Sequence, residues 1–386
     1  EHIFDLAERG NPLRTLAAVF HDLVYYNIDE RFTEAIRRTL KSYVKETKGK
    51  VFISENIPED DTCSNVTLEV FGFVPGQELS PYGGMNEFLS AMVMNKKLVG
   101  SIDPFDLVIA TACIEATIPF RGKNKDGKNP AEVLADRLSA MNKKHAFGMS
   151  SEDIVDIVQT AVSFANKDVE NFSEKEVARF LDNTWKLLPE TNPSLRTTGI
   201  YTIKNYRIAL QKMEGFLCFL NPENVFASYK GVPKEKELKE LNGRAERNIL
   251  AAREYLGIKL LTTGVLEAIA AISGGDAPIS LFMGDIQHTE EAQRFEDLLP
   301  AITPSPEKQI DTTLHELLAF GRASASDFDL KNSPLANYLY LSLGDTGYKD
   351  RLQDARRMFE SEIKPKAFLD TLPSDAIIPV IDACSE

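Results

Sequence analysis

The chain has 386 residues, with 44 Lys and Arg against 58 Asp and Glu, which leaves a net charge of -14 and a pI near 5.0. A protein that wraps a nucleic-acid backbone needs a basic face, so this balance argues against that class. Hydrophobic residues make up 43% and charged residues 26% of the chain, as in an ordinary globular protein and unlike a disordered one. The length fits one large domain or two of medium size.

Helical periodicity begins at the first residues. Apolar positions recur at i, i+3 and i+4, and Pro12 stands where a first helical position tolerates proline. The pattern predicts helices over 3–8, 12–26 and 31–48. It then changes, because β-branched and aromatic residues gather at 51–53 and 66–71 on either side of an acidic loop. These two runs predict a small β-hairpin inserted at about 50–75.

The remainder of the chain is again mostly helical. A polar loop is expected at 121–129 and a turn at 189–193. Helices are expected over 86–98, 104–118, 130–144, 150–172 and 234–272, the last with breaks at Gly243 and Gly257. The predicted fold is therefore mainly α, with a first domain over 1–185 that contains the β insertion and a second helical domain, of unknown role, over 186–386.

Cysteine spacing and hydropathy bear on the compartment. The four cysteines lie far apart, which favours a reducing compartment over a disulfide framework or a thiolate metal site. The longest apolar stretch, 260–272, contains Glu267 and falls short of the roughly 20 residues that span a bilayer. The chain begins at Glu1 with neither methionine nor a leader pattern, so we expect no signal peptide and some natural residues upstream. We expect a cytoplasmic protein without a membrane segment.

Two of the five histidines flank the predicted turn between the first two helices. His2 lies 8 residues before Gly10, and His21 lies 9 residues after Pro12. At about 1.5 Å per residue, each stands roughly 12 to 14 Å from the turn of an antiparallel helix pair, so the two face each other. Asp22 follows His21 directly. Imidazole and carboxylate together suit a divalent metal ion.

Two acidic residues lie on apolar helical stripes. Asp168 continues the stripe that begins at Ile154, and Glu115 continues the stripe of Val108 and Thr111. A buried carboxylate must be paired or bound to metal, because burying it alone costs several kcal/mol. Asp168 is therefore a candidate metal ligand, with a structural ion pair as the alternative. Glu115 is a candidate active-site residue, with a structural salt bridge as its alternative.

Residues 16–26 (LAAVFHDLVYY) resemble the central motif of the HD superfamily of metal-dependent phosphohydrolases. They are most similar to predicted HD phosphohydrolases that read F-H-D-x-V-Y. In this resemblance His21 and Asp22 match the paired ligands, His2 matches the upstream histidine, and residues 164–169 (FANKDV) resemble the late helix that carries the closing aspartate, Asp168. Asp103 and Asp106 fit that last position less well. The resemblance covers roughly 1–175 and leaves 190–386 unexplained.

The resemblance implies hydrolysis of a phosphate ester, in a small phosphorylated molecule or nucleotide, at one divalent metal ion (Mn, Fe, Zn, Ni or Mg). The metal would be held by His2, His21, Asp22 and Asp168, and Asp22 or Glu115 could act as general base. A single metal is expected because only His145 lies between the paired ligands and the last aspartate.

Positive charge for the substrate is expected from the basic loop after the Glu115 helix. Pro119 ends that helix and could aim Arg121, with Lys123 nearby, at a phosphate group. A solvated loop is the alternative. The rival function is a degenerate HD scaffold that binds a nucleotide or a protein partner without turning it over. Nothing in the sequence indicates an oligomeric state.

Overall fold

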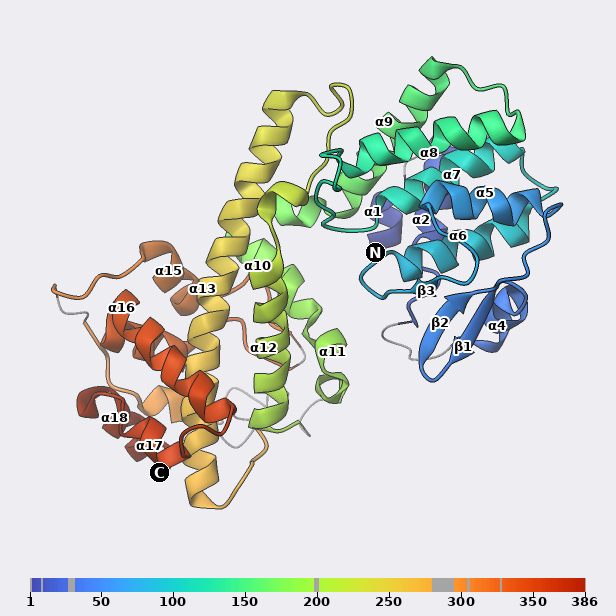
Figure 1. Cartoon of the computed structure of the whole chain (residues 1–386). Coiled ribbons are helices and arrows are strands. Elements are labelled where there is room, and N and C mark those ends of the chain that lie inside the picture. The colour runs from blue at the N-terminus through green and yellow to red at the C-terminus, as the bar shows by residue number, and fades with distance from the viewer. Residues whose placement is uncertain are drawn as a thin grey trace. The chain divides into compact units, whose positions relative to one another are not determined.

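The computed structural model describes residues 2–7, 10–26, 32–197, 201–279, 295–303, 306–326 and 328–385, apart from the side chains of His2 and Phe295. These residues are mainly helical and include one small antiparallel sheet, as the sequence predicted (Figure 1). The chain forms two compact units. Unit 1 contains Glu1–Asn171 and Asn221–Gly243, and unit 2 contains Phe172–Leu220 and Arg244–Glu386. The sequence placed a single boundary near 185, whereas the chain passes between these units at three points.

Unit 1 is a helical assembly with the sheet at its edge (Figure 1). Its sheet has the order β1-β2-β3 and is antiparallel throughout, with β1 Val44–Thr47, β2 Lys50–Ile53 and β3 Glu78–Leu79. Its helices are α1 (His2–Leu6), α2 (Pro12–Phe20), α4 (Glu34–Leu40), α5 (Thr62–Phe71), α6 (Met85–Leu98), α7 (Pro104–Ala116), α8 (Pro130–His145) and α9 (Ser151–Asp168).

Helix α7 lies at the centre of unit 1. It packs against α2, α5, α6, α8 and α9, and its side chains are buried on several faces because other helices surround it. Its apolar run supplies Val108, Ala112, Cys113 and Ile114 to the core. Because α2 and α9 both pack on α7, the residues at their C-terminal ends can meet although they are far apart in the sequence.

Two predicted elements in and before the insertion were wrong. Residues 66–71 are not a strand but the second half of α5, whose N-terminus is capped by Asp61, with the backbone N–H of Ser64 donating to its Oδ1 at 3.1 Å. Their β-branched and aromatic side chains reflect burial within the helical core. The helix expected over 31–48 ends at Leu40, and the hairpin that follows turns at Lys48 and Gly49, both with positive φ.

Unit 2 is built around one long helix. Its helices are α10 (Val177–Lys186), α11 (Leu188–Thr191), α12 (Ile203–Phe219), α13 (Glu235–Ser273), α15 (Thr312–Phe320), α16 (Pro334–Phe359), α17 (Pro365–Leu369) and α18 (Ser374–Ser385), with the first residues of α13 belonging to unit 1. The breaks expected at Gly243 and Gly257 were wrong, because α13 is continuous through both. Gly257 instead allows close packing, since a Cβ there would lie 3.2 Å from Leu352 of α16.

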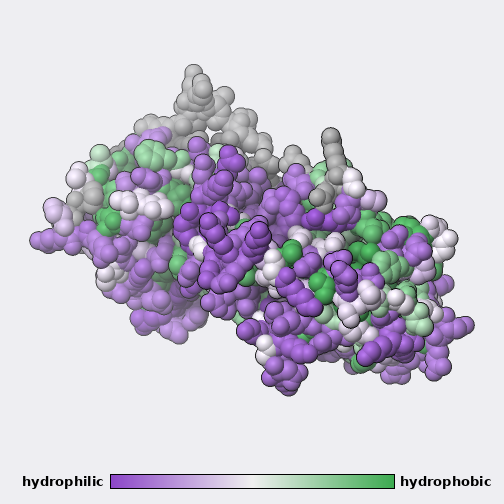
Figure 2. Space-filling view, turned by 90° about the horizontal axis from the view of Figure 1, so that it is seen from above, coloured by the Kyte–Doolittle hydropathy of each residue, from purple (hydrophilic) through white to green (hydrophobic). Residues whose placement is uncertain are grey.

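Helix α13 also has the length and composition of a membrane span. Its most apolar window has a mean hydropathy of 1.5, but 72% of that window is buried inside the protein. The core helix of a soluble protein has the same pattern, so this helix is weak evidence for a membrane. Hydrophilic residues cover most of the face in Figure 2, and hydrophobic ones gather in smaller areas.

A buried charge cluster joins α10, α12 and α13 to the segment before α16. Asp329 is fully buried and accepts hydrogen bonds from Trp185 Nε1 at 2.7 Å and Tyr206 Oη at 2.6 Å. Arg322 and Lys259 lie 3.1 and 3.3 Å from its carboxylate. Burial alone would raise the pKa of Asp329, but these two cations lower it below its ordinary value.

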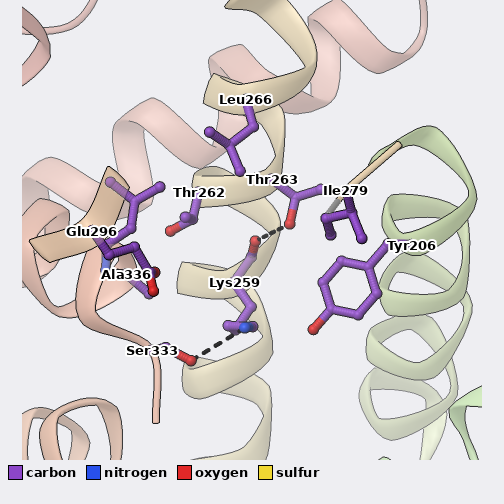
Figure 3. A pocket seen from close by; sticks show the side chains of 10 residues that line it. Tyr206, Lys259, Thr262, Thr263, Leu266, Ile279, Glu296, Ser333 and Ala336 are labelled. Atoms are coloured by element: carbon purple, nitrogen blue, oxygen red, sulfur yellow. Dashed lines mark hydrogen bonds between the residues drawn. The ribbon is translucent and has the colours of Figure 1, made fainter. Parts of the chain in front are cut away.

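The ammonium group of Lys259 also donates to Ser333 Oγ at 3.1 Å, on the wall of a cavity of about 20 Å³ (Figure 3). A cavity of this size holds about one water molecule. The cluster therefore reads as a structural support of unit 2, with too little space for a substrate.

Asp329→Asn removes the one carboxylate that compensates two buried cations. We expect it to lower the free energy of unfolding by about 3 to 5 kcal/mol, because a buried charge that loses its partner is strongly destabilising. Chemical denaturation followed by tryptophan fluorescence measures this, since Trp185 contacts Asp329. The control Asp370→Asn, which removes an exposed pair with Lys366, should change it by less than about 1 kcal/mol. Equal effects of the two substitutions would contradict the structural role of Asp329.

Candidate functional site

His21 caps the C-terminus of α2 and is 2% exposed. Its Nδ1 lies 2.9 Å from the carbonyl oxygen of Ala18. A carbonyl can only accept a hydrogen bond, so Nδ1 carries the hydrogen and donates it. The ring edge packs against Phe164 of α9 at 6.2 Å between centroids. These contacts fix the ring and direct Nε2 away from the backbone of α2.

Nε2 of His21 faces two carboxylates from different parts of the chain. It lies 3.0 Å from Oδ2 of Asp22 and 3.4 Å from Oδ1 of Asp168. The Asp22 side chain is 46% exposed, whereas that of Asp168 is 15% exposed. The structure therefore brings together three of the four residues that the sequence suggested as metal ligands. Asp168, and not Asp103, meets His21; Asp103 caps α7 by accepting from the N–H of Phe105.

The position of Asp168 follows from its helix. Ser150 and Asp153 form a capping box at the start of α9, and Ile154, Ile157 and Val158 are buried, as the apolar stripe predicted. The apolar stripe fixes which face of α9 turns inward. Asp168 is the last residue of that helix, at the edge of the buried stripe.

The two carboxylates control the protonation of His21. Burial lowers the pKa of the imidazole, but hydrogen bonds to Asp168 and Asp22 outweigh it and raise the pKa from 6.5 to about 10. In the metal-free protein the ring is therefore a cation at neutral pH. It compensates part of the charge of the two aspartates.

Helix α6 holds the chain that follows Asp22. The backbone N–H of Val24 donates to Ser90 Oγ at 3.0 Å, and that of Tyr26 donates to Asn86 Oδ1 at 3.1 Å. Both acceptors lie on α6, four residues apart, so they share one face of that helix. These bonds fix the backbone immediately after the His-Asp pair.

Glu87 stands beside those acceptors on α6 and was missed in the sequence. Burial, together with the charges of Asp22 and Asp168, raises its pKa to about 7, although a backbone hydrogen bond and the charge of Arg121 lower it. Its carboxyl group is therefore within electrostatic reach of the site. One signal in the sequence could have pointed to Glu87: it lies with the polar residues Asn86 and Ser90 on a helix that is otherwise mostly buried.

The donor atoms fit the spacing of a metal's first shell. With bonds of about 2.1 Å, neighbouring donors lie about 3.0 Å apart in an octahedral shell and about 3.4 Å apart in a tetrahedral one. The separations of His21 Nε2 from Asp22 and Asp168 match these values. Within the described ranges, however, no group of three or more His, Cys, Asp or Glu side chains is already arranged to hold a metal ion. Here the three side chains form an ion-pair cluster, from which His21 must lose a proton to bind metal.

The side chain of His2 lies outside the described residues. The helix that carries it, α1, packs against both α2 and α9, which carry His21 and Asp168. The histidine is therefore on an element next to the cluster.

The carboxylate of Glu115 forms ion pairs with two arginines. Its buried carboxylate lies 2.5 Å from Arg121 Nη1 and 3.0 Å from Arg137 Nη1. Arg121 also donates to the carbonyl oxygens of Glu115 and Ile118. Both guanidinium groups donate hydrogen bonds to this carboxylate, so this geometry favours the structural salt bridge over the general base. The guanidinium of Arg121 is turned back onto its own helix end.

Arg121 and Lys123 both line a cavity of about 360 Å³ within unit 1. Lys123 is exposed and, in the part of the chain that the structure describes, makes no ion pair, so its charge is available to a ligand. The basic loop is thus placed against a cavity.

Comparison with protein-family models, with curated proteins and with solved structures gives no match to this chain.

Glu115→Gln tests the structural role of this ion-pair cluster. We expect unit 1 to lose about 3 kcal/mol of unfolding free energy, because two partly buried guanidinium groups lose their anionic partner. Denaturant unfolding monitored by circular dichroism measures the loss. The control Glu34→Gln removes an exposed i,i+4 pair with Arg38 and should cost less than about 0.5 kcal/mol. A variant of unchanged stability would return Glu115 to the list of candidate bases.

Proposed function

We propose that this chain is a metal-dependent phosphohydrolase of the HD type, acting on a small phosphorylated molecule. His21, Asp22 and Asp168, with His2 from the neighbouring helix, would hold one divalent metal ion. The observation that carries the proposal is the hydrogen bond from His21 Nδ1 to Ala18, which directs Nε2 to two carboxylate oxygens. Metal-binding histidines characteristically donate their other ring nitrogen in this way.

The chemistry divides between the metal and the protein. When bound, a divalent ion supplies positive charge that polarises a phosphoryl oxygen and acidifies water. Glu87, with a pKa near neutrality, accepts the proton of the attacking water, a role that the sequence had suggested for Asp22 or Glu115. Lys123 adds positive charge near the substrate. Ala18 and the backbone clamp from α6 keep His21 and Asp22 in place.

The rival proposal is a scaffold that binds its ligand without hydrolysis. The ion-pair cluster favours it, because His21, Asp22 and Asp168 already compensate one another's charges without a metal. The two proposals differ in whether the cluster exchanges its proton for a metal ion.

Metal binding should depend steeply on pH. A ligating imidazole must be neutral, and the pKa of His21 is about 10 without metal, so each bound Mn²⁺ displaces one proton. We expect the affinity for Mn²⁺ to rise about tenfold per pH unit between about pH 6 and pH 9. Calorimetric titration in buffers of different ionisation enthalpy measures both the affinity and the released proton.

His21→Ala should abolish this binding, and His145→Ala is the matched control because His145 pairs with Glu69 and not with Asp22 or Asp168. A protein that binds no Mn²⁺ at any of these pH values would favour the binding scaffold. Binding that survives in His21→Ala would place the metal elsewhere.

Glu87→Gln should lower kcat about a hundredfold or more while leaving metal affinity within a few fold, because it removes a proton acceptor and no ligand. In the parent protein the rate should rise with pH through an acid limb at or below about 7, since the bound cation lowers the pKa of Glu87 from its metal-free value. With Mn²⁺ saturating at every pH, so that metal binding does not contribute to the profile, the variant should lose this limb. Manganese-supported hydrolysis of aryl and sugar phosphates measures both effects, with Glu78→Gln, an exposed residue paired to Lys50, as the control. A variant as active as the parent would exclude Glu87 as the base.

A further inference from the structure

The cavity of about 360 Å³ in unit 1 has a wall from the second half of the sequence. One side comes from the end of α7, the loop after it and the last turn of α9. The other side comes from residues 223–228 and Leu238, which belong to unit 1 although the chain reaches them only after passing through unit 2. Its volume lies in the range of about 300 to 1,000 Å³ that is typical of small-molecule sites.

Residues 223–228 are held to α9 by two hydrogen bonds between one side chain and one backbone unit. The Asn166 amide donates to the carbonyl oxygen of Ala227 at 2.8 Å and accepts from its N–H at 2.9 Å. Asn166 and Ala165 line the cavity, and Asp168 of the same helix contacts His21. The cavity and the cluster therefore lie on adjacent faces of the end of α9.

The lining combines flat apolar groups with available polar ones. Pro119, Phe120 and Phe226 supply apolar surface. Of the polar groups, the Asn224 amide makes no side-chain hydrogen bond to any described residue, and Lys123 makes no ion pair there. Planar rings pack well on such apolar walls, and an amide can donate to or accept from a ring edge.

The local charge is positive although the protein is acidic. The charged residues that line the cavity or belong to the Glu115 ion pairs beside it are three cations, Arg121, Arg137 and Lys123, and two anions, Glu115 and Glu223. Their sum is one net positive charge, whereas the whole chain carries -14. Arg121 also connects the two places, because it lines the cavity and its charge lowers the pKa of Glu87. An anion in the cavity would approach the cluster from this side.

We propose that the cavity binds the ring-bearing part of a small organic phosphate, with Asn224 at the ring edge and Lys123 beside the negative charge. This inference rests on the proposed function, since it gives the leaving group of the same reaction a site. It assigns substrate selection to residues 223–238, a segment of unit 1 that comes from the second half of the sequence.

The test is direct binding without metal. Calorimetric titrations in EDTA compare ribonucleoside 5′-monophosphates and p-nitrophenyl phosphate with glycerol phosphate, which has no ring. We expect at least one ring-bearing phosphate to bind more tightly than glycerol phosphate. Lys123→Met should weaken that binding about tenfold, because a hydrogen bond to a charged group is lost, and Asn224→Leu should weaken it several fold. Lys125→Met, on the same exposed loop but outside the cavity, should have no effect.

Two results would overturn the inference: no ring-bearing probe binds better than glycerol phosphate, or the preferred probe binds equally to the parent, Lys123→Met and Asn224→Leu. Because the titration needs neither metal nor turnover, its outcome is separate from that of the hydrolysis assay. Variant-sensitive binding without hydrolysis would support the cavity and count against the phosphohydrolase.

Discussion

The candidate site depends on the orientation of one imidazole ring. Ala18 accepts the hydrogen of Nδ1, and this leaves Nε2 of His21 facing Asp22 and Asp168. The orientation is possible because α2 and α9 pack on the same central helix, α7, and because Ser90 and Asn86 hold the backbone that follows Asp22. Core packing in unit 1 thus determines where a histidine and two carboxylates meet.

Charge burial distinguishes this cluster from those of Asp329 and Glu115. Asp329 and Glu115 are each paired with two cationic side chains, and Asp329 also accepts hydrogen bonds from Trp185 and Tyr206, so the protein itself compensates both charges. At His21 the anions outnumber the cations, because one imidazole lies between two aspartates. The charges of both aspartates also raise the pKa of Glu87. A divalent cation in place of the imidazole proton would restore the balance there, which is why the proposed metal site lies at this cluster.

The sequence was sufficient for those parts of the site that depend on local periodicity. The apolar stripe predicted that Asp168 would lie on the half-buried face of its helix, and the structure places it against His21. Glu87 could not be found in this way, because a glutamate in a first helical turn is ordinary and its burial comes from tertiary packing. Residues 66–71 were misread because burial favours β-branched residues in helices as well as in strands. The return of residues 221–243 to unit 1 has no local signal at all.

The most direct measurement is the anomalous scattering of crystals soaked with Mn²⁺ above neutral pH, where the His21 proton is most easily displaced. We expect one peak within about 2.0 to 2.3 Å of His21 Nε2 and of a carboxylate oxygen from each of Asp22 and Asp168. The same data would locate the side chain of His2. A peak elsewhere, or none at this cluster with His21 still paired to both aspartates, would contradict the proposed metal site.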